Sequence, residues 1–245
     1  PTHQCVFNTP GTYWVEDLVA DTGGMDDVVN MYIVVTPPNG GGGGDTTAPT
    51  VSMTAPSAGN AKGTFTVSAN ATDNAGGSGM NNVKFYRDTI SAGNLLTTIN
   101  GAGPSYSFLW PTTPDGAHTL FAVATDNSNN STTSASVSIT VDNTAPTASI
   151  TSPSAGATVS GTIAVNATST DGGSGVASVA FWLDGVNTGT PLGTDTASPF
   201  SVNWNTNSVS DGAHTLTAVA TDNVGLSTTS SVVNVSVKNN LTPLS

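Results

Sequence analysis

The sequence predicts an all-β protein that consists of two tandem antiparallel β-sandwiches, preceded by a partial β-sandwich segment. Three observations lead to this prediction. The 245 residues include only 4 Lys and Arg together and a single glutamate, whereas Thr and Val, which favour strands, are abundant. One stretch of sequence occurs twice. Within each copy, short runs of alternating apolar and polar residues are separated by Gly, Pro, Asn and Asp clusters.

The repeat has the length of a small domain. DTTAPTVSMTAPSAG at 45–59 returns as DNTAPTASITSPSAG at 142–156, a shift of 97 residues from 45 to 142. DGAHTLFAVATDN at 115–127 returns as DGAHTLTAVATDN at 211–223. This period is too long for one unit of a solenoid and matches a whole domain, so we predict two tandem copies of one domain.

The alternation within each copy predicts strands with one face on a core. In TFTVSANA, Phe65, Val67 and Ala69 share one face, and in SVAFWLD, Val179 and Phe181 share another. Turn clusters such as PSAG and TDNSNN recur roughly every 8–12 residues, as in antiparallel sandwiches. We therefore expect about seven strands in each copy.

The copies resemble bacterial Ig-like domains of the kind found in secreted enzymes and surface adhesins. The TAPTVSMTAPSAG entry, the GSGMNNVKFYRD strand and the DGAHTLFAVATDN strand carry this resemblance, which covers 45–240. The resemblance implies tandem immunoglobulin-like sandwiches and a bacterial, extracellular protein. It implies no specific ligand, because one fold of this kind serves many functions.

The first 36 residues have a different pattern. PGTYWVEDLVADTGG followed by DVVNMYIVV resembles the C-terminal half of a PKD domain, another small β-sandwich. The residues that fit the pattern are Tyr13, Val15, Asp21, Gly23 and Gly24. Asp17 stands where the alternation expects an apolar residue, which indicates a bulge or an altered register. A segment this short does not bury a core alone, so we expect it to be a fragment or to be completed by strands of a partner chain.

Pro and Gly runs separate these parts. The Pro- and Gly-rich stretch at 37–47 predicts a flexible linker. VDNTAP at 141–146 leaves few residues between the copies, and Pro146 restricts the joint, so we expect a stiff tandem rod with one loose end. The predicted divisions are a PKD-like segment at 1–36, the linker at 37–47, Ig-like domains at 48–142 and 143–240, and a tail at 241–245.

Charge excludes several classes of partner. The net charge of −12 and the pI near 4.1 argue against nucleic acid, because phosphate binding requires clustered Lys and Arg. No apolar run approaches the roughly 20 residues that cross a bilayer, so we expect no membrane insertion. Polar, Lys-poor chains rich in Thr and Asn are common on bacterial surfaces, which favours a secreted or cell-surface location. Pro1 in place of an initiating Met indicates a processed or truncated end.

We find no convincing catalytic pattern and predict that the chain is not an enzyme. His118 and His214 occupy the same repeat position at the start of a strand, which favours hydrogen-bonded structural histidines at a sheet edge over a nucleophilic triad. The aspartates lie almost entirely in turn sequences, where side-chain to backbone hydrogen bonds explain them. Cys5 is the only cysteine, so the chain cannot form an internal disulfide. We expect Cys5 either to be buried as a small apolar residue or to form a disulfide with another chain.

Three aspartates form the candidate metal site. Asp126 lies in the TDN loop of the first copy, Asp142 in the junction, and Asp171 in the STDGGSG loop of the second copy. Ca²⁺ takes six to eight oxygen ligands, and the resemblance implies calcium at such joints because related adhesins place it there. The alternative is plain turn aspartates. The equivalent repeat positions are held by Asp45, Asp73 and Asp222. No cofactor other than Ca²⁺ is expected.

Aromatic residues provide the candidate carbohydrate site. Trp110 and Trp204 precede DGAH at equivalent places and are expected as core anchors. Tyr86 and Trp182 are also equivalent and alternate out of phase with the apolar face, so they are the best candidates for exposed rings that stack on sugars. Packing beneath a neighbouring strand is the alternative for this pair.

The function that the sequence favours is a non-enzymatic extracellular stalk or spacer, structural or adhesive in character. One alternative is a subunit of an extracellular filament completed by strand exchange between chains. Another is a carbohydrate-binding accessory module of a secreted hydrolase. The expected partners are neighbouring domains of a larger protein, identical subunits in a filament, or a surface glycan.

Overall fold

In the computed structural model, the described residues are 11–20, 26–35, 44–101, 103–111 and 115–239, and for the first two ranges only the backbone is described. These residues form strands with two three-residue 3₁₀ turns, η1 (Ala92–Asn94) and η2 (Thr206–Ser208). Contacts divide the chain into two compact units. The first comprises Pro1–Pro56, Thr66–Phe108 and Thr119–Val137, and the second comprises Ser57–Phe65, Leu109–His118 and Ser138–Ser245.

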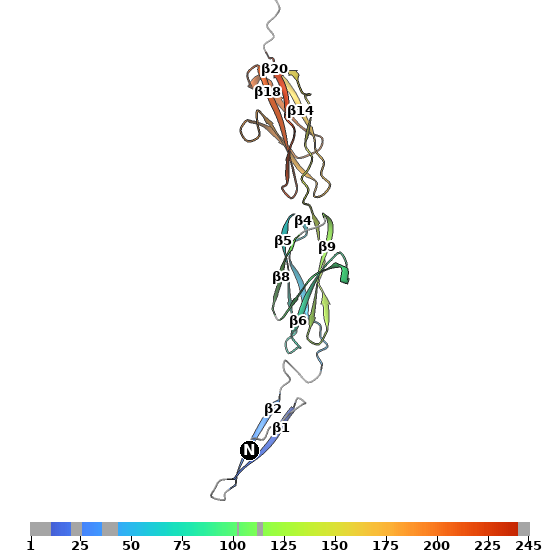
Figure 1. Cartoon of the computed structure of the whole chain (residues 1–245), viewed down its shortest axis with the longest axis vertical. Coiled ribbons are helices and arrows are strands. Elements are labelled where there is room, and N and C mark those ends of the chain that lie inside the picture. Colours follow the sequence, from blue (N-terminus) through green and yellow to red (C-terminus); the bar gives the residue numbers. More distant parts are fainter. Residues whose placement is uncertain (1–10, 21–25, 36–43, 102, 112–114, 240–245) are drawn as a thin grey trace, which may run out of the picture. The chain divides into compact units, whose positions relative to one another are not determined.

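The strands of the first copy form two sheets (Figure 1). The three-stranded sheet has the order β3 (Thr50–Ala55), β5 (Thr64–Thr72) and β8 (Ser105–Pro111). The other has the order β4 (Gly59–Ala61), β11 (Val137–Val141), β9 (Gly116–Asp126), β6 (Met80–Arg87) and β7 (Leu95–Asn100), with β10 (Ser131–Thr133) on β9. Phe85 of β6 packs against Phe108 of β8 at 5.2 Å between ring centroids, which joins the two sheets.

The second copy repeats this strand order. Its three-stranded sheet has the order β12 (Ser149–Ser152), β14 (Thr162–Thr168) and β17 (Phe200–Asn205). The larger sheet has the order β13 (Ala157–Val159), β20 (Val233–Val237), β18 (Gly212–Asp222), β15 (Val176–Leu183) and β16 (Thr190–Asp195), with β19 (Ser227–Thr229) on β18. The prediction of an all-β fold with tandem sandwiches is confirmed.

Two details differ from the prediction. Within the described residues, each copy contains nine strands, β3–β11 and β12–β20, rather than about seven, because short three-residue strands also pair. The pairing is not wholly antiparallel, since β4 with β11 and β13 with β20 are parallel. At the PSAG turns the chain crosses from the three-stranded sheet to the larger sheet, where β4 and β13 pair.

Alternation places the core as predicted. In β5, Val67 and Ala69 are buried, and in β15, Val179 and Phe181 are buried. The predicted core anchors are confirmed, because both tryptophans that precede DGAH are buried, namely Trp110 and Trp204. Burial of these apolar faces is the main driving force for each sandwich.

The N-terminal segment contains a two-stranded antiparallel sheet of β1 (Gly11–Ala20) and β2 (Asp26–Val35) (Figure 1). Pairing runs without a register shift from Gly11 opposite Val35 to Ala20 opposite Asp26, and Asp17 pairs with Val29. The bulge or altered register expected at Asp17 is therefore not present. The predictions for Cys5, Asp21, Gly23, Gly24, the linker up to 43 and the tail at 241–245 lie outside the described residues.

Candidate metal centre

Two groups of three aspartates stand out among the described residues. The first acidic group is Asp45, Asp73 and Asp126, and the second acidic group is Asp142, Asp171 and Asp222. In each group, every aspartate offers a carboxylate oxygen that lies within 4.8 Å of the oxygens of the other two. Two oxygens bound to one Ca²⁺ at about 2.4 Å lie at most about 4.8 Å apart, so both groups have the spacing of a calcium site.

Strand ends position the second acidic group. Asp222 is the last residue of β18, Asp142 directly follows β11, and Asp171 lies in the loop between β14 and β15. All three belong to the second compact unit. Asp142 and Asp222 are buried, and Asp171 is half-buried. Buried carboxylates at strand ends need hydrogen-bond donors or a cation to offset their lost hydration.

Backbone N–H groups hold each carboxylate of the second acidic group in place. Asp142 accepts from the N–H groups of Thr144 at 3.1 Å and Ser174 at 2.7 Å. Asp171 Oδ2 accepts from Gly175 N at 2.6 Å. Asp222 Oδ1 accepts from the N–H groups of Val224 and Leu226, at 2.9 and 2.8 Å. The three side chains are thus fixed by the turns that surround them.

Two oxygens of this group have no such partner. Among the residues that the structure describes, Asp171 Oδ1 and Asp222 Oδ2 are buried and receive no hydrogen bond. Asp222 itself is only 2% exposed. An unpaired carboxylate oxygen in such a place is costly, so this group is chemically incomplete as it stands.

Glycines bring the backbone close to the second acidic group. A Cβ on Gly173 would lie 2.3 Å from Asp142 Cγ, closer than any real contact allows. Gly175 has φ +84°, a left-handed conformation that favours glycine, and its N–H is the donor to Asp171. Gly173 and Gly175 therefore allow the loop to close over the carboxylates.

The first acidic group has the same scaffold with more donors. Asp45 accepts from the N–H groups of Thr47 and Ser78, at 3.0 and 2.9 Å. Asp73 accepts from Asn74 N through Oδ1 at 2.9 Å and from Gly79 N through Oδ2 at 2.6 Å. Each carboxylate oxygen of this pair therefore has a donor.

Asp126 is the third member of the first acidic group and is fully buried. Its Oδ1 accepts from Ser128 N and Asn130 N, at 2.9 and 2.8 Å. The Asn130 side-chain amide donates to Asp126 Oδ2 and to the Asp45 carbonyl, both at 2.8 Å. The amide thus completes this group, whereas the equivalent residue of the second copy is Leu226.

Hydrogen bonds stabilise the ionised carboxylates. Burial raises the pKa of Asp142, but hydrogen bonds from Ser174 and from the N–H of Thr144 outweigh it, and the pKa lies below its usual value. Backbone N–H groups of Ser78 and Thr47 also lower the pKa of Asp45. Asp142 and Asp45 therefore carry negative charge at neutral pH.

The structure distributes the three predicted metal ligands over two groups. Asp142 and Asp171 come together, and Asp222 is their third partner, whereas Asp126 lies with Asp45 and Asp73. The reason is strand direction. Val237, at the end of β20, pairs with Gly212, at the start of β18, so the end of β20 lies away from Asp222. The repeat transfers this relation to β11 and β9, which end before Asp142 and at Asp126.

Surface hollows adjoin the second acidic group. A hollow of about 270 Å³ is lined by Asp115, Gly116, Asp142, Thr144, Gly172 and Gly173. A second, of about 320 Å³, includes Asp171 and Phe200 in its lining. Each hollow thus includes one aspartate of this group in its lining.

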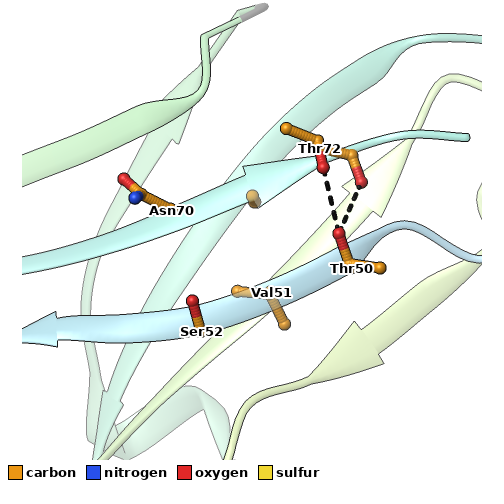
Figure 2. Close-up of a pocket in the computed structure, with 6 residues that line it drawn as sticks. Thr50, Val51, Ser52, Asn70 and Thr72 are labelled. Atoms are coloured by element: carbon orange, nitrogen blue, oxygen red, sulfur yellow. Dashed lines mark hydrogen bonds between the residues drawn. The ribbon is translucent and has the colours of Figure 1, made fainter.

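Figure 2 shows a different hollow, of about 250 Å³, over β3 and β5. Thr50 and Thr72 point toward one another, and Thr50 Oγ1 lies 3.1 Å from the Thr72 carbonyl and 3.0 Å from Thr72 Oγ1. The other lining residues are Val51, Ser52, Asn70 and Ala71. Because none of these six has an aromatic ring, this hollow offers no stacking surface for a sugar.

The predicted carbohydrate-binding rings are only half-buried. Tyr86 is paired between Phe121 of β9 and Leu95 of β7, and Trp182 between Thr217 of β18 and Pro191 of β16. Both therefore lie within the larger sheet, flanked by neighbouring strands. Their role in sugar binding stays a prediction.

Histidine 214 is hydrogen-bonded as predicted. His214 Nδ1 lies 2.7 Å from Asp184 Oδ2, and Nε2 lies 2.9 Å from the Ser210 carbonyl. The strand that carries it, β18, lies inside its sheet rather than at an edge. The hydrogen bond to Asp184 raises the pKa of His214. His118 is buried, with its ring centroid 6.1 Å from that of Trp110.

No helix within the described residues is long and apolar enough to cross a bilayer.

Two family models match the copies. The model of the bacterial Ig domain matches residues 49–122 and 146–218, and that of the bacterial Ig-like domain (group 3) matches residues 104–180. The matched ranges begin at residue 49, so the resemblance of 1–36 to a PKD domain stays a prediction. No curated protein matches the chain.

Some solved structures are similar to this chain at low sequence identity. The fibronectin(III)-like modules of Clostridium thermocellum CbhA are 22% identical over 78% of this chain and 94% of theirs, with a TM-score of 0.43. A structure from work on the host cell surface retention of a 1.5-MDa bacterial ice-binding adhesin is 18% identical to this chain. The match covers 91% of this chain and 73% of that one, with a TM-score of 0.37.

Proposed function

Since the chain belongs to the bacterial Ig domain family, we propose that it is a non-enzymatic extracellular spacer whose tandem sandwiches hold a neighbouring domain away from a surface. Domains of this family are typical of structural or adhesive extracellular modules. The observation that carries the proposal is the repetition of one complete sandwich, with the same strand order in both copies. Repetition extends a chain without adding a new site.

The surface chemistry supports this role. The net charge of −12 keeps such a chain soluble and discourages association with anionic polymers. The spacer therefore acts through its length, and its partners are the domains on either side of it.

Light scattering and negative-stain microscopy of the full chain test this proposal. We expect monodisperse, elongated single particles that hydrolyse no polysaccharide. A compact particle contradicts the spacer. Specific retention on a glycan array that Trp182→Ala abolishes would instead favour the carbohydrate-binding module.

A second candidate, a filament subunit, rests on the N-terminal sheet. Within the described residues, β1 and β2 pair only with one another, along ten residue pairs. A two-stranded sheet is marginal in water and gains stability from added strands, which an identical chain could supply. Regular filaments in the same micrographs, lost in Met31→Pro because proline removes a backbone donor from β2, would favour this candidate.

A further inference from the structure

We propose that the second acidic group binds one Ca²⁺ and that the first acidic group does not, because the Asn130 amide already completes the first group. This inference is independent of the spacer function. It concerns a site whose three carboxylates all lie in the second compact unit.

The unpartnered oxygens of the second group point to a cation. Asp222 is 2% exposed, and its Oδ2 receives no hydrogen bond from any described residue. Asp171 Oδ1 is buried and unpartnered in the same way. Both oxygens belong to carboxylates whose ligand atoms lie within 4.8 Å of one another and of Asp142. One cation among them satisfies both oxygens and neutralises the clustered charge.

The donor chemistry selects calcium. Carboxylate oxygens are hard ligands, which suit Ca²⁺ and Mg²⁺, whereas Zn²⁺ takes nitrogen and sulfur ligands more often. Mg²⁺ requires near-ideal octahedral geometry and keeps several of its waters. Ca²⁺ accepts irregular arrangements and exchanges water for protein oxygens, as buried oxygens at strand ends require.

The carboxylates are held in place before the ion arrives. Each of them accepts a backbone hydrogen bond, from Thr144 and Ser174 to Asp142, from Gly175 to Asp171, and from Val224 and Leu226 to Asp222. Gly173 has no Cβ and so allows the loop to approach Asp142. Little side-chain freedom is therefore lost on binding, which favours affinity.

The first group shows what removes the need for an ion. The Asn130 amide donates to Asp126 Oδ2, the oxygen equivalent to the unpartnered Asp222 Oδ2. Asn74 N donates to Asp73 Oδ1, the oxygen equivalent to the unpartnered Asp171 Oδ1. Leu226 stands in place of Asn130 and has no side-chain donor. The loop of the second copy also lacks an equivalent of Asn74, since DGGSG replaces DNAGGSG.

Calorimetric titration of the full, chelator-treated chain with CaCl₂ tests the proposal. We expect one Ca²⁺ per chain and a rise in Tm of several degrees at saturation. MgCl₂ should bind at least tenfold more weakly. No binding, two equal sites, or equal affinity for Mg²⁺ would overturn the proposal.

An exchange of residues between the copies assigns the site. Leu226→Asn should abolish Ca²⁺ binding, and Asn130→Leu should create a second, weaker site. Asp222→Asn, which keeps the side-chain shape, should also abolish binding. This second variant tests the site independently, in case Leu226→Asn alters folding. Asp27→Asn removes a charge outside both groups and should leave one Ca²⁺ per chain. Retained binding in both Leu226→Asn and Asp222→Asn would refute the assignment.

Discussion

The first and second acidic groups have equivalent aspartates and nearly the same backbone donors, yet they differ in whether every carboxylate oxygen receives a hydrogen bond. In the first group, Asn130 donates to Asp126 Oδ2, whereas in the second group Asp222 Oδ2 has no partner among the described residues. The difference shows that a repeat can preserve the scaffold of a site while one amide changes its chemistry. Turn geometry sets the positions of the carboxylates, and the residue four positions after the last aspartate decides what completes them.

The largest expected difference follows from removal of the last aspartate in each group. In chelator, Asp126→Ala should cost about 3 kcal/mol, because it leaves Ser128 N, Asn130 N and the Asn130 amide without their acceptor. Asp222→Ala should cost about 1 kcal/mol, since the lost backbone bonds are offset by removal of a buried, unpaired charge. Denaturant unfolding, with hydrogen exchange to assign each copy, measures both values. Equal losses would mean that the two groups are energetically alike.

Much of the fold was accessible from the sequence because it depends on local pattern. Alternation identified the buried faces of β5 and β15, and the repeat identified Trp110 and Trp204 as equivalent core residues. The parallel strands β4 and β13 were not predicted, because three residues after a turn are too few to show alternation.

The acidic groups were predicted less completely, since they depend on strand direction. Asp142 and Asp171 were expected together and are together. Asp126 was placed with them because it and Asp142 were expected at the same end of the first copy, but neighbouring antiparallel strands end at opposite ends of a sheet. The role of Asn130 could have been found by aligning the two copies, because Asn130 aligns with Leu226 at an otherwise similar turn.

A smaller effect is expected from glycines of the GGSG loop. Gly173→Ala places a Cβ 2.3 Å from Asp142 Cγ and should cost about 1–3 kcal/mol, because both the loop and the carboxylate are held by hydrogen bonds. Gly172→Ala is the matched control, since nothing lies within 4 Å of its Cβ. Thermal unfolding should show a loss for Gly173→Ala alone. The affinity for calcium should also fall in Gly173→Ala. An unchanged affinity would mean that Asp142 is not a ligand of the ion.

The smallest expected effect is a pH dependence of the second copy. In this copy, Asp184 Oδ2 lies 2.7 Å from His214 Nδ1. The hydrogen bond with Asp184 raises the pKa of His214, so its contribution to stability is full below the ordinary pKa of about 6.5 and is lost as pH rises through the raised value. Burial raises the pKa of Asp184, but hydrogen bonds from His214 and Thr215 lower it further, so its contribution is lost as pH falls through the lowered value.

The pair therefore stabilises the second copy most between about pH 4 and 6.5. Because the Asp184 side chain is 47% exposed, solvent screening limits the contribution of this pair to the free energy of unfolding to about 0.5 kcal/mol. Hydrogen exchange of β18 amides against pH measures it, and Asp184→Asn, which cannot carry the charge, should flatten the profile. A slope that persists in Asp184→Asn would assign the pH dependence of the second copy to another group.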